Sequence, residues 1–165
     1  MKRLFILRHA KSSWAQSELS DFDRPLNDRG VAAASFMGKF ITRTGFAPAA
    51  ILCSPAVRAR STAELVVAAG DIAADIQYDE RIYEASPQSL RQVASEIDGR
   101  YDSAMMIGHN PGIEGFIRFL TGEIQPMPTA ALAVIDLDID KWHEIDADRG
   151  KLVDIYRPKA EMART

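Results

Sequence analysis

The sequence predicts an α/β fold, in which one three-layer αβα domain has a mainly parallel central sheet and antiparallel edge strands near its C-terminus. Three short apolar runs without alternation are typical of strands buried on both faces. Each run is followed by a segment whose apolar residues have helical spacing, which is typical of parallel strand–helix units. A chain of 165 residues is the usual length of one domain, so we expect residues 1–165 to form a single unit.

The first half of the chain supplies two of the strand–helix pairs, and the segment before residue 122 supplies the third. A glycine follows each expected helix and can end it, because glycine adopts the left-handed backbone that closes many helices. The pairs are Leu4–Leu7 with 36–41 before Gly45, Ala49–Cys53 with 62–69 before Gly70, and Ala104–Ile107 with 113–120 before Gly122.

Three Ser-Pro or Asn-Pro pairs indicate helix starts. Ser86 is expected to be an N-cap with Pro87 as the first helical residue, and Ser54-Pro55 and Asn110-Pro111 have the same form. The last third of the chain has a different pattern. Strands are expected over 133–137, 142–145 and 152–156 as an antiparallel edge, and residues 158–165 are expected to be a solvated tail.

Composition excludes several classes of protein. A net charge of −3 argues against general affinity for nucleic acid or for an anionic membrane, so neither is expected as a partner. One cysteine, Cys53, excludes an intramolecular disulfide framework and a multi-cysteine zinc site, and three histidines make a histidine-rich metal site improbable. The apolar N-terminal run is too short for a signal peptide, so a cytoplasmic location is expected. No glycine-rich nucleotide motif is present, and no cofactor or metal is expected.

The residues that follow the three apolar runs point to one site. Ligands of open α/β sheets bind outside the carboxyl ends of the strands. The first run ends in Arg8-His9, the second leads to Arg58 through Ser54-Pro55, and the third ends in Gly108-His109. Arginine guanidinium groups match phosphate oxygens bidentately, and helix starts add backbone N–H donors. A neutral histidine can attack phosphorus, while a second, charged histidine can stabilise the oxygens.

Each of these residues has a simpler interpretation when it is taken alone. Arg58 could be an exposed helix residue, and His109 could belong only to a loop and helix cap. The third histidine, His143, has no such support: it lies beside Trp142 in a polar turn-and-strand region and is interpreted as a surface residue. A phosphoryl site is the favoured interpretation, because separate structural roles for these residues would require three independent coincidences at one edge of the sheet.

Three motifs carry a family resemblance. Arg8-His9-Ala10 resembles the Arg-His-Gly signature of the histidine phosphatase superfamily, residues 54–62 resemble its Ser-Pro-x-x-Arg-Ala-x-x-Thr motif, and Gly108-His109-Asn110-Pro111 resembles its third motif. The resemblance covers nearly the whole chain and is nearest to the SixA-type phosphohistidine phosphatases. It implies a phosphoglycerate mutase-like fold and a nucleophilic His9 with Arg8, Arg58 and His109 around the phosphoryl group. It also implies a general acid, for which Glu84 is our candidate; Glu84 could instead only favour the following helix start.

Two departures from the family pattern concern the rim of the site. Ala10 replaces the signature glycine and is expected to crowd the turn. Ala15 stands where mutase-like members have a phosphate-binding asparagine, which argues against mutase activity. The remaining candidates for phosphate or substrate binding are Ser12, Ser13, Arg24 and Asn110; Arg24 could instead pair with Asp21 or Asp23, and Lys11 is interpreted as a solvated lysine.

The sequence therefore predicts a metal-independent phosphatase that works through phospho-His9. The chain has no long insertion that could form a lid, so a phosphohistidine side chain on another protein is the favoured substrate. A small-molecule phosphomonoesterase and a non-catalytic module that binds phosphorylated residues are the alternatives. The oligomeric state is left open.

Overall fold

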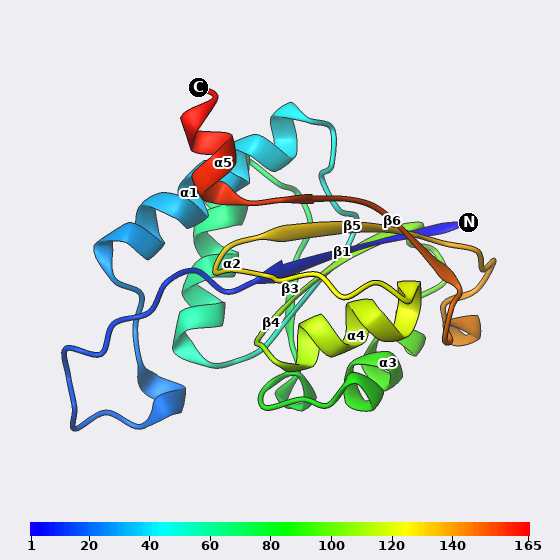
Figure 1. Cartoon of the computed structure of the whole chain (residues 1–165), viewed down its shortest axis with the longest axis horizontal. Helices are drawn as coiled ribbons and strands as arrows, with labels where there is room; N and C mark the ends of the chain where they lie inside the picture. Colours follow the sequence, from blue (N-terminus) through cyan, green and yellow to red (C-terminus); the bar gives the residue numbers. More distant parts are fainter.

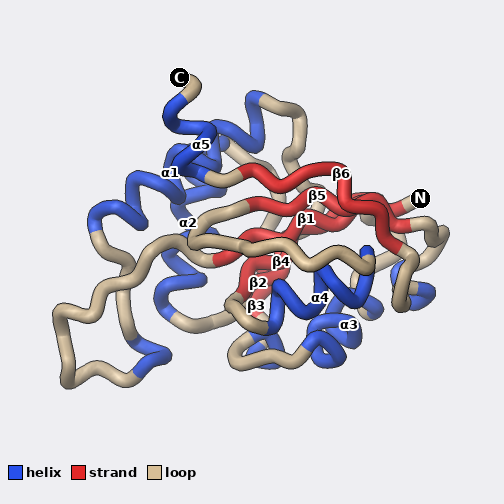
Figure 2. Tube along the Cα trace, viewed as in Figure 1, coloured by secondary structure: helices blue, strands red, loops and turns tan.

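A six-stranded sheet forms the middle layer of the protein, whose computed structural model describes residues 1–165 (Figures 1 and 2). The strand order is β3-β2-β4-β1-β5-β6, and the first four strands in that order are parallel. The predicted α/β class and mainly parallel sheet are thus confirmed. The strands are β1 (Lys2–Arg8), β2 (Ile51–Cys53), β3 (Ile76–Tyr78), β4 (Ser103–Gly108), β5 (Leu132–Leu137) and β6 (Gly150–Tyr156).

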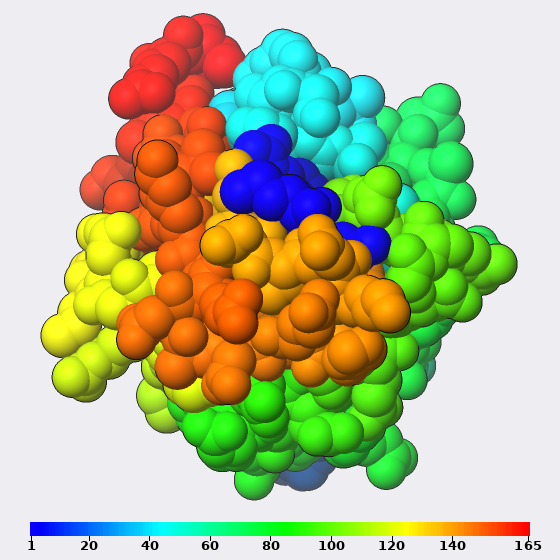
Figure 3. Space-filling model, turned by 90° about the vertical axis from the view of Figure 1, so that its right-hand side faces the viewer, coloured from blue at the N-terminus to red at the C-terminus, as the bar shows by residue number.

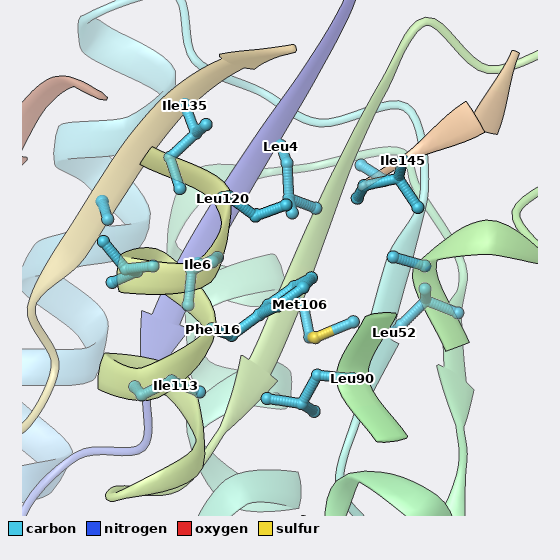
Figure 4. Packing of buried hydrophobic residues seen from close by; sticks show 14 of the residues in the cluster. Leu4, Ile6, Leu52, Leu90, Met106, Ile113, Phe116, Leu120, Ile135 and Ile145 are labelled. Atoms are coloured by element: carbon cyan, nitrogen blue, oxygen red, sulfur yellow. The ribbon is translucent and has the colours of Figure 1, made fainter. Parts of the chain in front are cut away.

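Helices cover both faces of the sheet, as Figure 2 shows. One face carries α1 (Asp28–Arg43), α2 (Val57–Gly70) and α5 (Pro158–Ala163), and the other carries α3 (Pro87–Ser95) and α4 (Gly112–Thr121). The apolar runs are explained by this arrangement, because alternate residues of β1 enter two cores. Leu4 and Ile6 pack under α3 and α4 (Figure 4), whereas Phe5 and Leu7 pack under α1 and α2.

Strand register brings three loops to one edge of the sheet. Arg8 of β1 pairs with Gly108 of β4, and Cys53 of β2 pairs with Ile107. The ladder continues one residue further, because the His9 N–H donates to the Gly108 carbonyl and the Ser54 N–H to that of Ile107, both at 3.1 Å. The loops that follow these three strands therefore start side by side at the same edge of the sheet.

One of the three predicted helix starts is confirmed. The Ser86 hydroxyl accepts from the Ser89 N–H, and Pro87 opens α3. The other two predictions are wrong: α2 begins at Val57 and α4 at Gly112, in both cases without a side-chain cap. Ser54 and Asn110 direct their polar groups to the site instead.

The C-terminal third follows the prediction in part. Residues 142–144 form a 3₁₀ turn rather than a strand, because Trp142 is buried in the core and its indole N–H donates to the Tyr101 carbonyl at 2.8 Å. The predicted antiparallel strands at this side of the sheet are confirmed as β5 and β6, which follow β1 in the strand order. Residues 158–163 form the short helix α5, in which Pro158 is buried, and most of the residues after it are exposed, as expected of a solvated tail.

The two ends of the sheet have different surroundings. Figure 3 looks at the end where β1 starts, and there the segment after β5 (orange) packs beside the N-terminus (blue). The carboxyl ends of β1, β2 and β4 face the opposite side, where the long loop before α1 projects (Figure 1). No helix of the chain is long and apolar enough to span a membrane.

Candidate active site

A hollow of about 250 Å³ lies at the carboxyl edge of the sheet. All three predicted loops contribute to it, and so does the segment before α1. The structure therefore brings together the two arginines and two histidines that the sequence singles out. The lining residues are Arg8, His9, Lys11, Ser12, Trp14, Arg24, Arg58, His109, Asn110 and Thr129.

His9 is buried at the base of this hollow, and its ring is held in one orientation. Its Nδ1 lies 2.7 Å from the Ala10 carbonyl oxygen. A carbonyl only accepts, so Nδ1 carries the hydrogen and the neutral ring keeps a free lone pair on Nε2. Burial, together with the positive charges of Arg58 and Arg8, lowers the pKa of His9 to about 4, although the bond to Ala10 opposes this. His9 is therefore neutral at physiological pH, in the form that can attack an electrophile.

The loop that carries His9 is tied to α2 through Thr62. The Ala10 N–H donates to Thr62 Oγ1 at 2.9 Å, and the same hydroxyl donates to the Arg58 carbonyl at 2.7 Å. The methyl group of Ala10 is fully buried in the core under α1 and α2, and its backbone is not left-handed. The methyl group that replaces the signature hydrogen is thus part of the core, and the turn does not need the left-handed backbone that favours glycine.

Arg8 and Arg58 are each held along one edge of the guanidinium group. Arg8 Nη1 donates to the Met127 carbonyl at 3.1 Å, whereas Arg58 donates through Nη1 and Nη2 to the backbone and carboxylate of Asp21, at 2.6 and 3.0 Å. The Nε of each arginine is buried and has no partner in the protein. Burial and the neighbouring Arg58 lower the pKa of Arg8, against the opposing effect of Glu114. Two buried, unpartnered N–H donors on charged groups form a site that favours an anion.

His109 lies beside His9, with ring centroids 5.0 Å apart. Its Nε2 is 2.7 Å from the Ser54 hydroxyl, while its Nδ1 is buried without a partner. Burial, with the proximity of His9 and Arg58, lowers the pKa of His109 to about 3. With no anion bound, the ring is neutral among these positive charges. A negatively charged phosphoryl group beside the two rings would favour the protonated form of His109. The charged histidine that the sequence predicts therefore stays a prediction for the phosphate-bound site.

Asn110 and Glu114 fix the opposite wall. The Asn110 amide donates to Glu114 Oε1 at 3.0 Å and to the Met127 carbonyl at 2.9 Å, and Glu114 Oε1 also accepts from the Met127 N–H at 2.8 Å. Asn110 therefore holds the loop that anchors Arg8, while its Oδ1 remains buried and unpartnered.

The segment before α1 supplies the outer wall. Arg24 is buried, donates from Nη1 to the Ser12 hydroxyl at 2.8 Å, and forms an ion pair with Asp21 through Nη2 at 3.2 Å. Of the two acidic neighbours considered for Arg24, Asp21 is thus the partner. Ser13 does not line the hollow, because its hydroxyl accepts from the Ala15 N–H.

Asp21 was not predicted as a site residue, yet it joins three groups at the site. Its carboxylate accepts from Arg58, from Arg24 and from the Tyr83 hydroxyl, the last at 2.7 Å. The bond from Tyr83, with those from Arg58 and Arg24, lowers the pKa of Asp21 to about 2, so the group is ionised. The spacing of Asp21 and Arg24 by three residues was the only sequence signal of this network.

Glu84 does not line the hollow, and its side chain is exposed. It follows Tyr83, whose ring meets His109 edge-on with centroids 5.5 Å apart. The structure thus places the carboxylate near the site but outside its wall.

Trp14 and Thr129 line the hollow without having been predicted, and Lys11 lies exposed at its mouth. His143 is exposed, as predicted. No three histidine, cysteine, aspartate or glutamate side chains are grouped so that they could hold a metal ion.

Comparisons with known proteins agree with this geometry. The sequence model of the histidine phosphatase superfamily (branch 1) matches residues 4–112. A crystal structure of a protein assigned as the phosphohistidine phosphatase SixA of Agrobacterium tumefaciens is 32% identical and has a TM-score of 0.81, with 95% of this chain and 98% of that chain covered.

Two further proteins are similar over nearly their whole length. The protein histidine phosphatase SixA in complex with tungstate has a TM-score of 0.79 at 21% identity, covers 96% of this chain and 99% of its own, and therefore compares in fold alone. An uncharacterised protein of Mycobacterium leprae is 29% identical over 93% of this chain and 100% of its own.

Proposed function

Because this chain belongs to branch 1 of the histidine phosphatase superfamily and is a phosphatase, we propose that it removes phosphoryl groups from phosphohistidine side chains of proteins. The phosphoryl group passes through a covalent bond to His9, without a metal ion. The observation that carries this proposal is the group of buried, unpartnered nitrogens around a neutral histidine: Arg8 Nε, Arg58 Nε and His109 Nδ1. Nitrogen donors in this arrangement suit a tetrahedral oxyanion.

In the first step, the lone pair on His9 Nε2 attacks phosphorus. A new P–N bond forms while the P–N bond to the substrate imidazole breaks, and the electron pair of the broken bond stays on the departing ring. Arg8 and Arg58 hold the phosphoryl oxygens, and their positive charge balances the charge that accumulates there. His109 donates its Nδ1–H to the same oxygens.

In the second step, water attacks the phosphorus of phospho-His9. The P–N bond to Nε2 breaks and its electron pair returns to the ring, which becomes neutral again, while the oxygen and both protons of the water leave with inorganic phosphate. The bond from Nδ1 to the Ala10 carbonyl keeps the ring in place through both steps, since it does not involve the reacting nitrogen.

The chemical nature of the leaving group determines whether the enzyme must supply a general acid that protonates it. When the second nitrogen of the substrate ring carries a proton, the ring leaves as a neutral imidazole and takes no proton from the enzyme. An ester oxygen, in contrast, needs a donor, and Glu84 stays our prediction for that role. The exposed position of Glu84 outside the wall therefore favours the phosphohistidine substrate over an alkyl ester.

The proposal is tested by turnover of a phosphohistidine-containing protein and of phenyl phosphate, with and without EDTA. The His9→Ala variant is expected to lose activity on both, whereas His143→Ala, an exposed histidine, is the matched control and keeps it. Acid-labile phosphate should appear on the wild-type chain during turnover. Unchanged activity of His9→Ala would overturn the mechanism, and loss of activity in EDTA would overturn the metal-free step.

A small-molecule phosphomonoesterase is the second candidate, because a hollow of about 250 Å³ accepts a phosphoryl group with a small substituent. Initial rates on the phosphohistidine protein and on a panel of small phosphoesters separate the two, and a large preference for the small esters would reverse the ranking. Binding of phosphopeptide without any turnover would instead indicate a non-catalytic binding module.

A further inference from the structure

We propose that the exposed ring of Trp14 is a stacking platform for the planar imidazole of phosphohistidine, so that Trp14 determines which leaving groups the site accepts. This inference rests on the proposed function and adds to it the recognition of the leaving group. It begins from the composition of the wall of the hollow, in which one large apolar side chain stands among polar and charged ones. Of the ten residues that line it, Trp14 is the only large apolar one, and its side chain is 77% exposed.

One face of the Trp14 ring is already in use. The guanidinium carbon of Arg24 lies 3.5 Å from the ring centroid, which is a close cation–π contact. Arg24 itself is buried, and it donates to Ser12 and to Asp21. With one face covered by Arg24 and most of the ring exposed, the other face of the indole is open to solvent, on a residue that lines the hollow.

The ring is presented on a fixed support, although it lies in a long loop. The two arms of the loop pair with each other: the Ser13 N–H donates to the Pro25 carbonyl at 2.8 Å, and the Asn27 N–H donates to that of Lys11 at 3.0 Å. A bridge between Ser12 and Leu26 lies between these bonds. The arms are thus joined on both sides of the bridge, directly before Trp14.

The same support is linked to the phosphoryl site. Asp21 accepts from both Arg24 and Arg58, so the residue beneath the Trp14 ring and a phosphate-binding arginine share one carboxylate. The position of the ring is therefore set relative to the group that holds the phosphoryl oxygens. A platform in that relation to the site suits a planar group attached directly to phosphorus.

The chemical character of the wall indicates which kind of phosphorylated group fits the hollow. The remaining wall is polar and charged, and the phosphoryl oxygens use it. The atoms beyond phosphorus meet the indole face, where a planar ring makes offset or edge-on contacts that a flexible alkyl chain does not. Imidazole is planar and aromatic, and it leaves the reaction without a proton from the enzyme. The platform and the choice of a phosphohistidine substrate thus support each other.

The test compares kcat/KM for wild type, Trp14→Ala and Trp14→Phe on three substrates: free phosphohistidine, phenyl phosphate and glycerol phosphate. Each variant is referred to wild type on the same substrate, so differences in leaving-group reactivity cancel. We expect Trp14→Ala to lose about tenfold on the two ring substrates and less than about twofold on glycerol phosphate, with most of the loss restored by Trp14→Phe. An equal loss on all three substrates, or no loss on any, would overturn the proposal.

A matched control and a binding measurement complete the design. Ile124→Ala removes an equally exposed apolar side chain, at 75% exposure, which does not line the hollow, and it should change none of the three ratios. The chain has two tryptophans, and Trp142 is buried, so fluorescence changes on ligand binding report on Trp14. In the His9→Ala variant, phosphohistidine should change the emission more than inorganic phosphate does; equal changes would count against stacking.

Failure of the inference and failure of the proposed function give different results. If wild type hydrolyses phenyl phosphate but not phosphohistidine, the phosphohistidine substrate is overturned. The ratio of losses on phenyl and glycerol phosphate still decides whether Trp14 recognises rings. If wild type hydrolyses phosphohistidine and Trp14→Ala does so equally well, the function stands and the platform is overturned.

Discussion

Lowering the pH from 6.5 to 5 should destabilise this protein through its two active-site histidines. Burial keeps both rings neutral in the folded chain, with pKa values of about 4 for His9 and about 3 for His109. In the unfolded chain, each titrates near its ordinary value of 6.5. The unfolded state therefore binds more protons below pH 6.5, so stability is complete above that value and is lost as the pH falls toward about 4.

The size of this loss follows from the two shifts. A group protonated only in the unfolded state contributes up to about 1.4 kcal/mol per pH unit, and less near its own pKa. Between pH 6.5 and 5, two such histidines together lower the free energy of unfolding by about 3 kcal/mol. The carboxyl group of Asp21, whose pKa is about 2, changes stability only at lower pH. The histidines therefore dominate this interval.

Urea unfolding at pH 7.5, 6.5 and 5 measures the effect. His9→Asn and His109→Asn should each remove about half of the loss between pH 6.5 and 5, and the double variant should remove most of it. His143→Asn changes an exposed histidine and serves as the control, with the pH dependence of wild type. If the double variant lost as much stability as wild type over the same interval, the argument from buried neutral histidines would be refuted.

Three further outcomes follow from the packing around the site. In Gly30→Ala, the new Cβ would overlap the Lys11 carbonyl oxygen, so we expect a loss of about 3 kcal/mol in urea unfolding, whereas Gly99→Ala, with nothing within 4 Å, should be nearly neutral. Thr62→Val leaves the buried Ala10 N–H without its acceptor and should cost about 1–3 kcal/mol together with a fall in kcat. Inorganic phosphate should raise the Tm of wild type progressively with concentration, while sodium chloride at equal ionic strength should not.

The layers and the site edge could be predicted because they follow from local patterns. Leu4–Leu7 is apolar throughout because successive side chains enter opposite cores, and this is what an uninterrupted apolar run indicates. β3 was not predicted, because its three residues Ile76–Tyr78 are partly exposed and too few to show a period. The strand expected over 142–145 was wrong because burial of Trp142 in a 3₁₀ turn produces the same apolar and polar spacing.

The walls of the site were predictable only where they adjoin a strand end. Arg8 is the last residue of β1, His9 and His109 directly follow β1 and β4, and Arg58 lies in the first turn of α2. Asp21 acts through contacts with residues 37 and 62 positions away, which no local pattern records. The same holds for Ser54, which resembles a helix cap in sequence but bonds to a histidine 55 residues further along.

The loop before α1 also affects which parts of this enzyme can accept amino-acid substitutions during evolution. From Lys11 to Asp23, no side chain is buried, so the wall that carries Trp14 adds almost nothing to either core. Surface segments with few buried side chains accept substitution without unfolding the rest, even where hydrogen bonds fix their backbone. His9, by contrast, is embedded in the packing that holds the sheet and α2 together. The proposed recognition of the leaving group by Trp14 and the chemical step at His9 would thus depend on regions of unequal mutational tolerance, so that selection could alter the first while the second is preserved.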